Sequence, residues 1–127
     1  MNKNLTLLVS RILLAHMFLI AGLGKIGAYA GTQAYMQSMG VPGALLPLVI
    51  LLEIGGSLAL ITGFFTRWMA VALGIFTAVA ALIFHHDFAN QMQQIMFMKN
   101  WTIVGGMLLL TVTGAGAWSI DAKMGRA

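Results

Sequence analysis

The stretch Ala44–Phe64, ALLPLVILLEIGGSLALITGF, decides the fold class of this chain. It is long enough to cross the hydrocarbon core of a bilayer, which takes about 17–25 mostly apolar residues in a helix. Its one charged residue, Glu53, costs about 2.5–3.5 kcal/mol at the centre of a membrane helix. About twelve Leu, Ile, Val and Phe residues each contribute roughly −0.3 to −0.6 kcal/mol on the same scale, so the stretch predicts a membrane-spanning helix.

Three further stretches of similar character lie on the two sides of the first. The sequence predicts four spans, at about Leu7–Ala28, Ala44–Phe64, Trp68–Phe84 and Trp101–Trp118. Three tryptophans fall at predicted span ends, where the indole ring prefers the level of the lipid headgroups. We therefore expect residues 1–127 to form a single all-α membrane domain, with four transmembrane helices in an antiparallel bundle.

The composition agrees with this prediction and excludes several classes of protein. Of the 127 residues 60% are hydrophobic and 8% are charged, whereas about 25% of a soluble domain is charged. An ordinary soluble enzyme, a disordered tail and a nucleic-acid-binding domain are excluded, and membrane lipids are the expected surroundings. The chain has no cysteine, which excludes thiol catalysis, iron–sulfur clusters and cysteine-based zinc sites.

The basic residues predict the orientation, because cytoplasmic loops carry an excess of Lys and Arg. They divide into Lys3, Arg11, Arg67, Lys123 and Arg126 on one side, and Lys25 and Lys99 on the other. We therefore expect both termini and the turn at Arg67 in the cytoplasm. The connections Tyr29–Gly43 and His85–Asn100 then face the outside.

Both outer connections carry a pattern of their own. Gly31–Met39 and Phe88–Met98 each place methionine and aromatic residues on one helical face and glutamines on another. This pattern predicts short amphipathic connector helices, either interfacial or re-entrant. The alternative is a partly ordered loop.

Small residues recur at helical spacing on every span and predict close helix packing, since lipid tails give no hydrophobic drive for helix association. The second span has Gly55, Ala59 and Gly63 four residues apart, and the fourth has Gly105 and Gly106. We expect these positions to lie in helix contacts.

Ionisable residues within the spans are the main functional signal, because such groups are costly in a membrane and face a partner. Arg11 and Lys25 lie fourteen residues apart on the first span, within about 40° of each other around the helix. Glu53 lies between them in depth, so we predict that it contacts Arg11 or Lys25. For the two basic residues the alternative is that the side chain reaches the headgroups; for Glu53 it is a structural ion pair or a protonated state.

The histidines give weaker signals. His16 is expected to face another neighbour and to form a structural hydrogen bond. His85-His86-Asp87 reads as a polar membrane edge with one histidine in a hydrogen-bond network, because adjacent histidines point about 100° apart on a helix and do not hold one metal. A haem between two histidines is disfavoured, since His16 is central and His85 peripheral.

A series of short segments runs along the chain in a set order. They are RILLAHMFLIAGLGK from Arg11, GTQAYM from Gly31, GVP from Gly40, EIGG from Glu53, GFFTR from Gly63, Phe84-His85, Lys99-Asn100 and Gly105-Gly106. In order and spacing they resemble the DoxX family of small membrane proteins, over about residues 8–121. His16 departs from the small or apolar residue expected at its position.

The resemblance implies a bacterial inner-membrane protein with four helices. Founding members of the family resemble subunits of a thiosulfate:quinone oxidoreductase or a terminal quinol oxidase, which implies a link to quinone and to redox partner subunits. The candidate polar pocket then comprises Arg11, Lys25, Glu53, His85, Lys99 and Asn100.

No metal and no intrinsic cofactor is expected, so any redox role would use a bound quinone or a partner subunit. The alternatives are a non-catalytic scaffold or assembly subunit and a small transporter, which would need to form homo-oligomers. Whether the chain is an enzyme stays open, since a fold does not settle a function.

Overall fold

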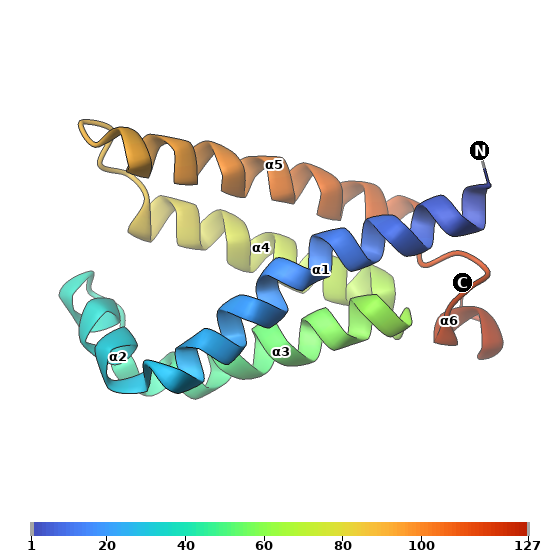
Figure 1. The fold of residues 1–127 in the computed structure, drawn as a ribbon, viewed down its shortest axis with the longest axis horizontal. Helices are drawn as coiled ribbons and strands as arrows, with labels where there is room; N and C mark the ends of the chain where they lie inside the picture. The colour runs from blue at the N-terminus through green and yellow to red at the C-terminus, as the bar shows by residue number, and fades with distance from the viewer. Residues whose placement is uncertain (1, 127) are drawn as a thin grey trace.

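The computed structural model describes residues 2–126 as an all-helical protein (Figure 1). Its elements are α1 (Lys3–Gly27), α2 (Tyr29–Ser38), the 3-10 turn η1 (Gly43–Leu45), α3 (Leu46–Thr62), α4 (Thr66–Phe84), α5 (Gln91–Thr113) and α6 (Ile120–Lys123). Four segments are long and apolar enough to cross a membrane: α1, η1 with α3, α4 and α5. The predicted fold class, four long apolar helices packed as a bundle, is confirmed.

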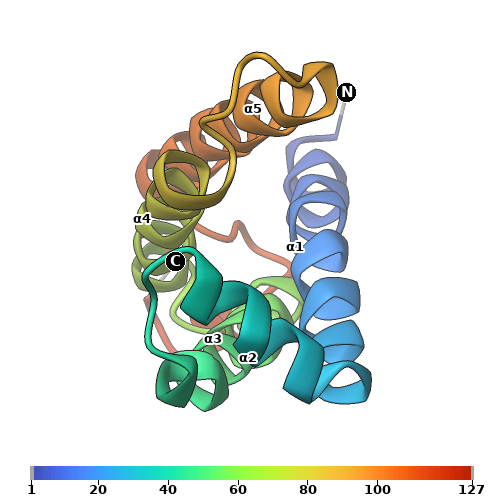
Figure 2. The ribbon, with the colours of Figure 1, turned by 90° about the vertical axis from the view of Figure 1, so that its left-hand side faces the viewer.

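The four long helices pack mainly as two antiparallel pairs. α1 packs against α3 and α4 against α5, while α3 and α4 make fewer contacts and α1 barely touches α5. Both chain ends lie at one end of the bundle, and α2 and the connection between α4 and α5 lie at the other (Figure 1). Seen from the α2 end, α1 stands apart from α4 and α5 (Figure 2).

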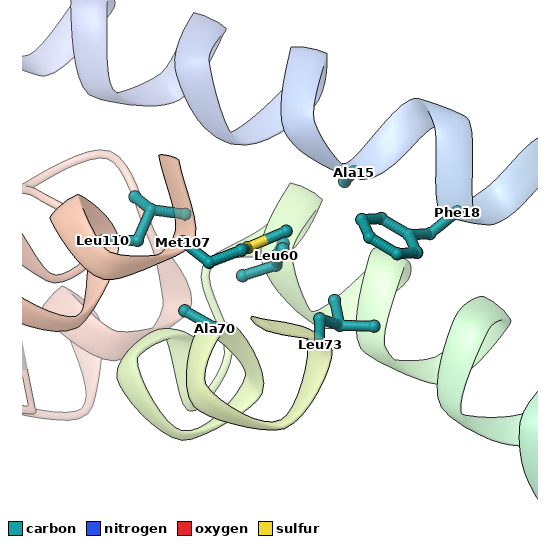
Figure 3. Close-up of a cluster of buried hydrophobic side chains, with 7 residues drawn as sticks. All are labelled: Ala15, Phe18, Leu60, Ala70, Leu73, Met107 and Leu110. Carbon is teal, nitrogen blue, oxygen red and sulfur yellow. The ribbon is translucent and has the colours of Figure 1, made fainter. Parts of the chain in front are cut away.

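The buried core lies where all four long helices converge (Figure 3). α1 contributes Ala15 and Phe18, and α3 contributes Leu60. The other members, from α4 and α5, are Ala70, Leu73, Met107 and Leu110. Small residues beside large ones let the helices interdigitate in the way that close-packed protein interiors require.

The small residues at the helix contacts are partly different from those predicted. Gly22 of α1 faces α3, where an added Cβ would lie 2.7 Å from Ile54 Cγ1, and Gly106 of α5 faces Leu14 at 2.8 Å. Gly55 and Gly105 are instead exposed, because the contact faces contain their neighbours Gly56 and Gly106. The predicted small-residue packing is present, but on α3 it is rotated by one residue.

The connector helices also differ from the prediction. The first is present as α2, which begins and ends within two residues of Gly31–Met39. The second is not separate: α5 begins at Gln91, capped by the Asn90 side chain, and continues unbroken into the fourth span. The same helix ends at Thr113, five residues before the predicted end, because Gly114 adopts a φ of 68° that does not continue a helix.

Candidate functional site

A cavity of about 500 Å³ is lined by residues of both helix pairs and of α2, the helix at the end of the bundle that faces the viewer in Figure 2. Its walls come from α1, α2, α3, α4 and α5, and they are mostly apolar. Five of the six candidate residues predicted from the sequence line it: Lys25, Glu53, His85, Lys99 and Asn100. An apolar cavity of this size with a few polar groups is typical of sites for small molecules.

Lys25 and Glu53 form an ion pair in the wall of this cavity. The Lys25 Nζ lies 2.7 Å from Glu53 Oε1, and only 4% of the Glu53 side chain is exposed. The predicted contact between Glu53 and a basic residue of the first span is therefore present. Gly22, one turn from Lys25, allows α1 to come this close, since an added Cβ would lie 3.2 Å from Glu53 Cβ.

The ion pair leaves donors of Lys25 unused. At 2.7 Å the ammonium satisfies the buried Glu53 Oε1 by a charge-assisted contact that needs only one of its hydrogens. Lys25 is partly exposed, and an ammonium group has three donors. An acceptor group of a ligand in the cavity can therefore take a hydrogen bond from Lys25.

The other polar residues surround the same space. The buried Asn100 amide donates to the Thr77 carbonyl at 3.2 Å, which holds it between α5 and α4. His85 Nδ1 lies 3.0 Å from Gln93 Oε1, so one histidine of the polar edge is in a hydrogen-bond network, as predicted. Lys99 is exposed at the edge of the cavity. Within residues 2–126 no group of three or more His, Asp or Glu residues could hold a metal ion.

An aromatic pair beside the cavity was not predicted. Tyr35 of α2 and Phe84 of α4 lie with ring centroids 5.4 Å apart, so they link α2 to the pair formed by α4 and α5. The sequence pattern put Tyr35 on the apolar face of a connector helix, and this pattern was the signal that pointed to it. Nothing local in the sequence indicates that Phe84, 49 residues away, is its partner.

Arg11 does not line the cavity, which corrects its place in the candidate pocket. Its side chain is fully buried near the other end of α1 and donates to the carbonyls of Leu60 at 3.0 Å, Ile61 at 3.1 Å and Trp118 at 2.6 Å. It therefore does not reach the headgroups either. The last carbonyls of α3 lack partners within the helix and carry partial negative charge, so they attract the guanidinium group. Arg11 lies about 21 Å along α1 from Lys25, which separates it from the cavity.

Two further charged residues cap helix ends at the same end of the bundle as Arg11. Arg67 donates to the carbonyls of Thr111 at 3.0 Å and Val112 at 2.6 Å, near the C-terminus of α5. The Asp121 carboxylate accepts from the N–H groups of Phe65 at 2.7 Å and Thr66 at 2.8 Å, at the start of α4. Each contact joins residues at least 44 positions apart, so local sequence patterns do not indicate them.

Burial by itself would raise the pKa of Asp121, but the backbone N–H groups of Thr66 and Phe65 and the Arg126 side chain favour the charged carboxylate. Together they hold the pKa below its ordinary value. The charged Asp121 cap therefore stabilises the folded protein fully above the ordinary pKa of about 3.9. This stabilisation is lost as the pH falls through the lower pKa of the folded state.

We expect Asp121→Asn to lower the free energy of unfolding by about 1–2 kcal/mol at neutral pH, because it weakens a charged helix cap. Below about pH 4 the difference from the unchanged protein should shrink, and it should vanish below the lowered pKa of the folded state, where both proteins carry a neutral side chain. Unfolding in detergent micelles across pH measures this. Asp87→Asn, at an exposed carboxylate, is the matched control, and a difference that does not change with pH would contradict the prediction.

His16 occupies a different place from the one expected. It does not face a neighbouring helix: its ring is exposed on the outer face of α1, and its Nδ1 bonds to the Leu13 carbonyl of the same helix. The predicted structural hydrogen bond is present, but within α1 itself.

Comparison with known proteins agrees with this arrangement. The DoxX family profile matches residues 6–86, which include the first three spans and most of the cavity-lining residues. The chain belongs to the DoxX family. It is 53% identical to the inner membrane protein YqjF of Escherichia coli over 124 residues, which cover 98% of this chain and 95% of YqjF.

A second relative from the same organism, the inner membrane protein YphA, is 37% identical over 95% of this chain and 91% of its own length. Both relatives match this chain over nearly its full length, so the chain is a multi-pass protein of the inner membrane. No solved structure shows a significant match to it.

Proposed function

We propose that the cavity binds the ring of a lipid-soluble quinone, and that the chain is the quinone-binding subunit of a membrane redox complex. The observation that supports this most directly is the Lys25–Glu53 pair in the wall of an otherwise mostly apolar cavity of about 500 Å³. A quinone has two carbonyl acceptors on a flat ring and an apolar tail. It therefore needs a donor, a flat aromatic contact and an apolar exit.

The cavity offers each of these. Lys25 can donate to one quinone carbonyl while it stays paired with Glu53, and a charge-assisted bond of this kind is among the stronger ones. The Tyr35–Phe84 pair lies in the cavity wall, where aromatic rings can stack on the quinone ring. The weak contact between α1 and α5 leaves room for an apolar tail to pass between the helix pairs to the lipid.

Under this proposal the electrons come from a partner subunit. The chain has no cysteine to hold an iron–sulfur cluster, and its central and peripheral histidines do not match in depth. We propose that both termini lie in the cytoplasm, because α6 and the start of α4, which carry Lys123 and Arg67, lie at their end of the bundle (Figure 1). The cavity then lies toward the outer side of the inner membrane.

The test removes both charges of the pair together. Lys25→Met alone would leave the buried Glu53 charge without a partner, so the variant combines Lys25→Met with Glu53→Gln. We expect it to fold and to bind a short-tailed benzoquinone about 10–100-fold more weakly, as the loss of one bond from a charged donor predicts. Titration of the purified protein in lipid nanodiscs measures the affinity, with Lys123→Met, an exposed lysine far from the cavity, as the control.

Equal quinone affinity of the double variant and the unchanged protein would contradict the proposal. Mass spectrometry of the protein extracted from membranes gives a second test. Co-purified quinone supports the proposal. Stoichiometric protein partners without quinone would instead support the scaffold alternative.

A further inference from the structure

His16 lies near the middle of α1, and its side chain is exposed on the outer face of that helix. Its Nδ1 faces the Leu13 carbonyl, which can only accept, so Nδ1 carries the proton and Nε2 is an acceptor. No donor among residues 2–126 reaches Nε2. In a helix that spans the membrane this leaves a polar nitrogen facing hydrocarbon, where an unmade hydrogen bond is costly.

The face around His16 has a regular pattern. Leu5, Val9, Ile12, His16, Leu19, Leu23 and Ile26 follow one another at spacings of four and three residues. This is the heptad pattern of helices that pack side by side, and His16 occupies its centre. All are exposed except the half-buried Leu19, so α1 presents this seam outward, away from the core of its own bundle.

We infer that the chain forms a homodimer through this seam of α1, with the two His16 side chains facing each other. Exposed apolar residues do not by themselves mark the seam as an interface, since lipid covers them without cost. The unpartnered imidazole of His16 marks it, because its free nitrogen needs a hydrogen-bond partner. Two copies with the same orientation in one membrane are related by a two-fold axis along the membrane normal. Their α1 helices then run parallel, and each seam residue lies opposite its own counterpart.

A second copy therefore brings a polar group to the depth of His16, as the polar residue at the centre of a coiled-coil seam does. Both Nε2 atoms are acceptors, so one hydrogen must bridge them. It comes from a water molecule or from a second proton on one imidazole. No contact of the cavity or of the core is needed, so the inference does not depend on quinone binding.

Disulfide cross-linking tests the geometry cleanly, because the chain has no cysteine of its own. Ile12→Cys and Leu23→Cys, made singly and oxidised in native membranes, should each give a species of twice the chain mass. Val112→Cys is the control, because Val112 is 75% exposed but lies on α5. Equal cross-linking of the control, no dimer at either seam position, or capture only of a different protein would overturn the inference.

The role of His16 is tested separately. His16→Leu should weaken dimerisation about three- to tenfold, as the loss of one interhelical hydrogen bond in a membrane predicts. His16→Asn can pair with itself and should restore most of the affinity. Sedimentation equilibrium in detergent micelles measures the dissociation constants, and a His16→Leu variant that dimerises as tightly as the unchanged protein would overturn the role of His16.

Discussion

Replacing Arg11 by methionine is expected to lower the free energy of unfolding by about 3–5 kcal/mol. Methionine is similar in length and apolar, so the space is filled, but three charge-assisted hydrogen bonds are lost. The Leu60 carbonyl keeps the Gly63 N–H at 3.2 Å, but the carbonyls of Ile61 and Trp118 stay in place with no other donor among residues 2–126. The variant therefore removes the buried donor and leaves its acceptors, which costs more free energy than removing both partners would.

Arg67→Met is the matched control, because Arg67 also binds two carbonyls near a helix C-terminus but is exposed. Water can replace its bonds, so the expected loss is about 1 kcal/mol or less. Both variants are measured by reversible unfolding in mixed micelles. Equal losses for the two arginines, or a stable Arg11→Met protein, would show that burial does not decide the effect.

The second large effect is expected for Gly63→Ala, in the turn between α3 and α4. Gly63 has a φ of 74°, which alone costs an alanine about 1–2 kcal/mol. The new Cβ would also collide with Ser119 Cβ, and it would lie 3.1 Å from Ser119 Cα and 2.7 Å from Arg11 Nη1. Since Ser119 Cα is backbone and Arg11 is buried, we expect a total loss of about 3 kcal/mol or more.

Gly40→Ala separates the two causes. Gly40 has a φ of 82° but nothing lies within 4 Å of its added Cβ, so only the backbone cost of about 1–2 kcal/mol applies. Unfolding of both variants under the same conditions measures the difference. Equal losses in the free energy of unfolding for Gly63→Ala and Gly40→Ala would contradict the prediction. They would show that the close approach of the C-terminal segment to this turn does not stabilise the end of the bundle.

Much of the cavity could be anticipated from the sequence. Ion pairing of Glu53 with a basic residue of the first span follows from the cost of a charge in the membrane, whatever the detailed packing. The choice of Lys25 over Arg11 does not follow, because both lie on the same face of α1 at similar distance in depth. The tertiary structure decides it: the end of α3 and the Trp118 carbonyl offer Arg11 three acceptors that depend on contacts far apart in sequence.

The sequence by itself determined that this is a membrane protein with four spans, because span length and apolar content are local properties and the bilayer sets their scale. It also indicated a short helix after the first span. Only the tertiary structure decided which glycine of each pair packs, where α5 begins and ends, and that His16 faces outward. These features depend on how each helix is rotated against its neighbours. A shift of one residue along a helix rotates the contact face by about 100°, and the local sequence pattern does not fix that rotation.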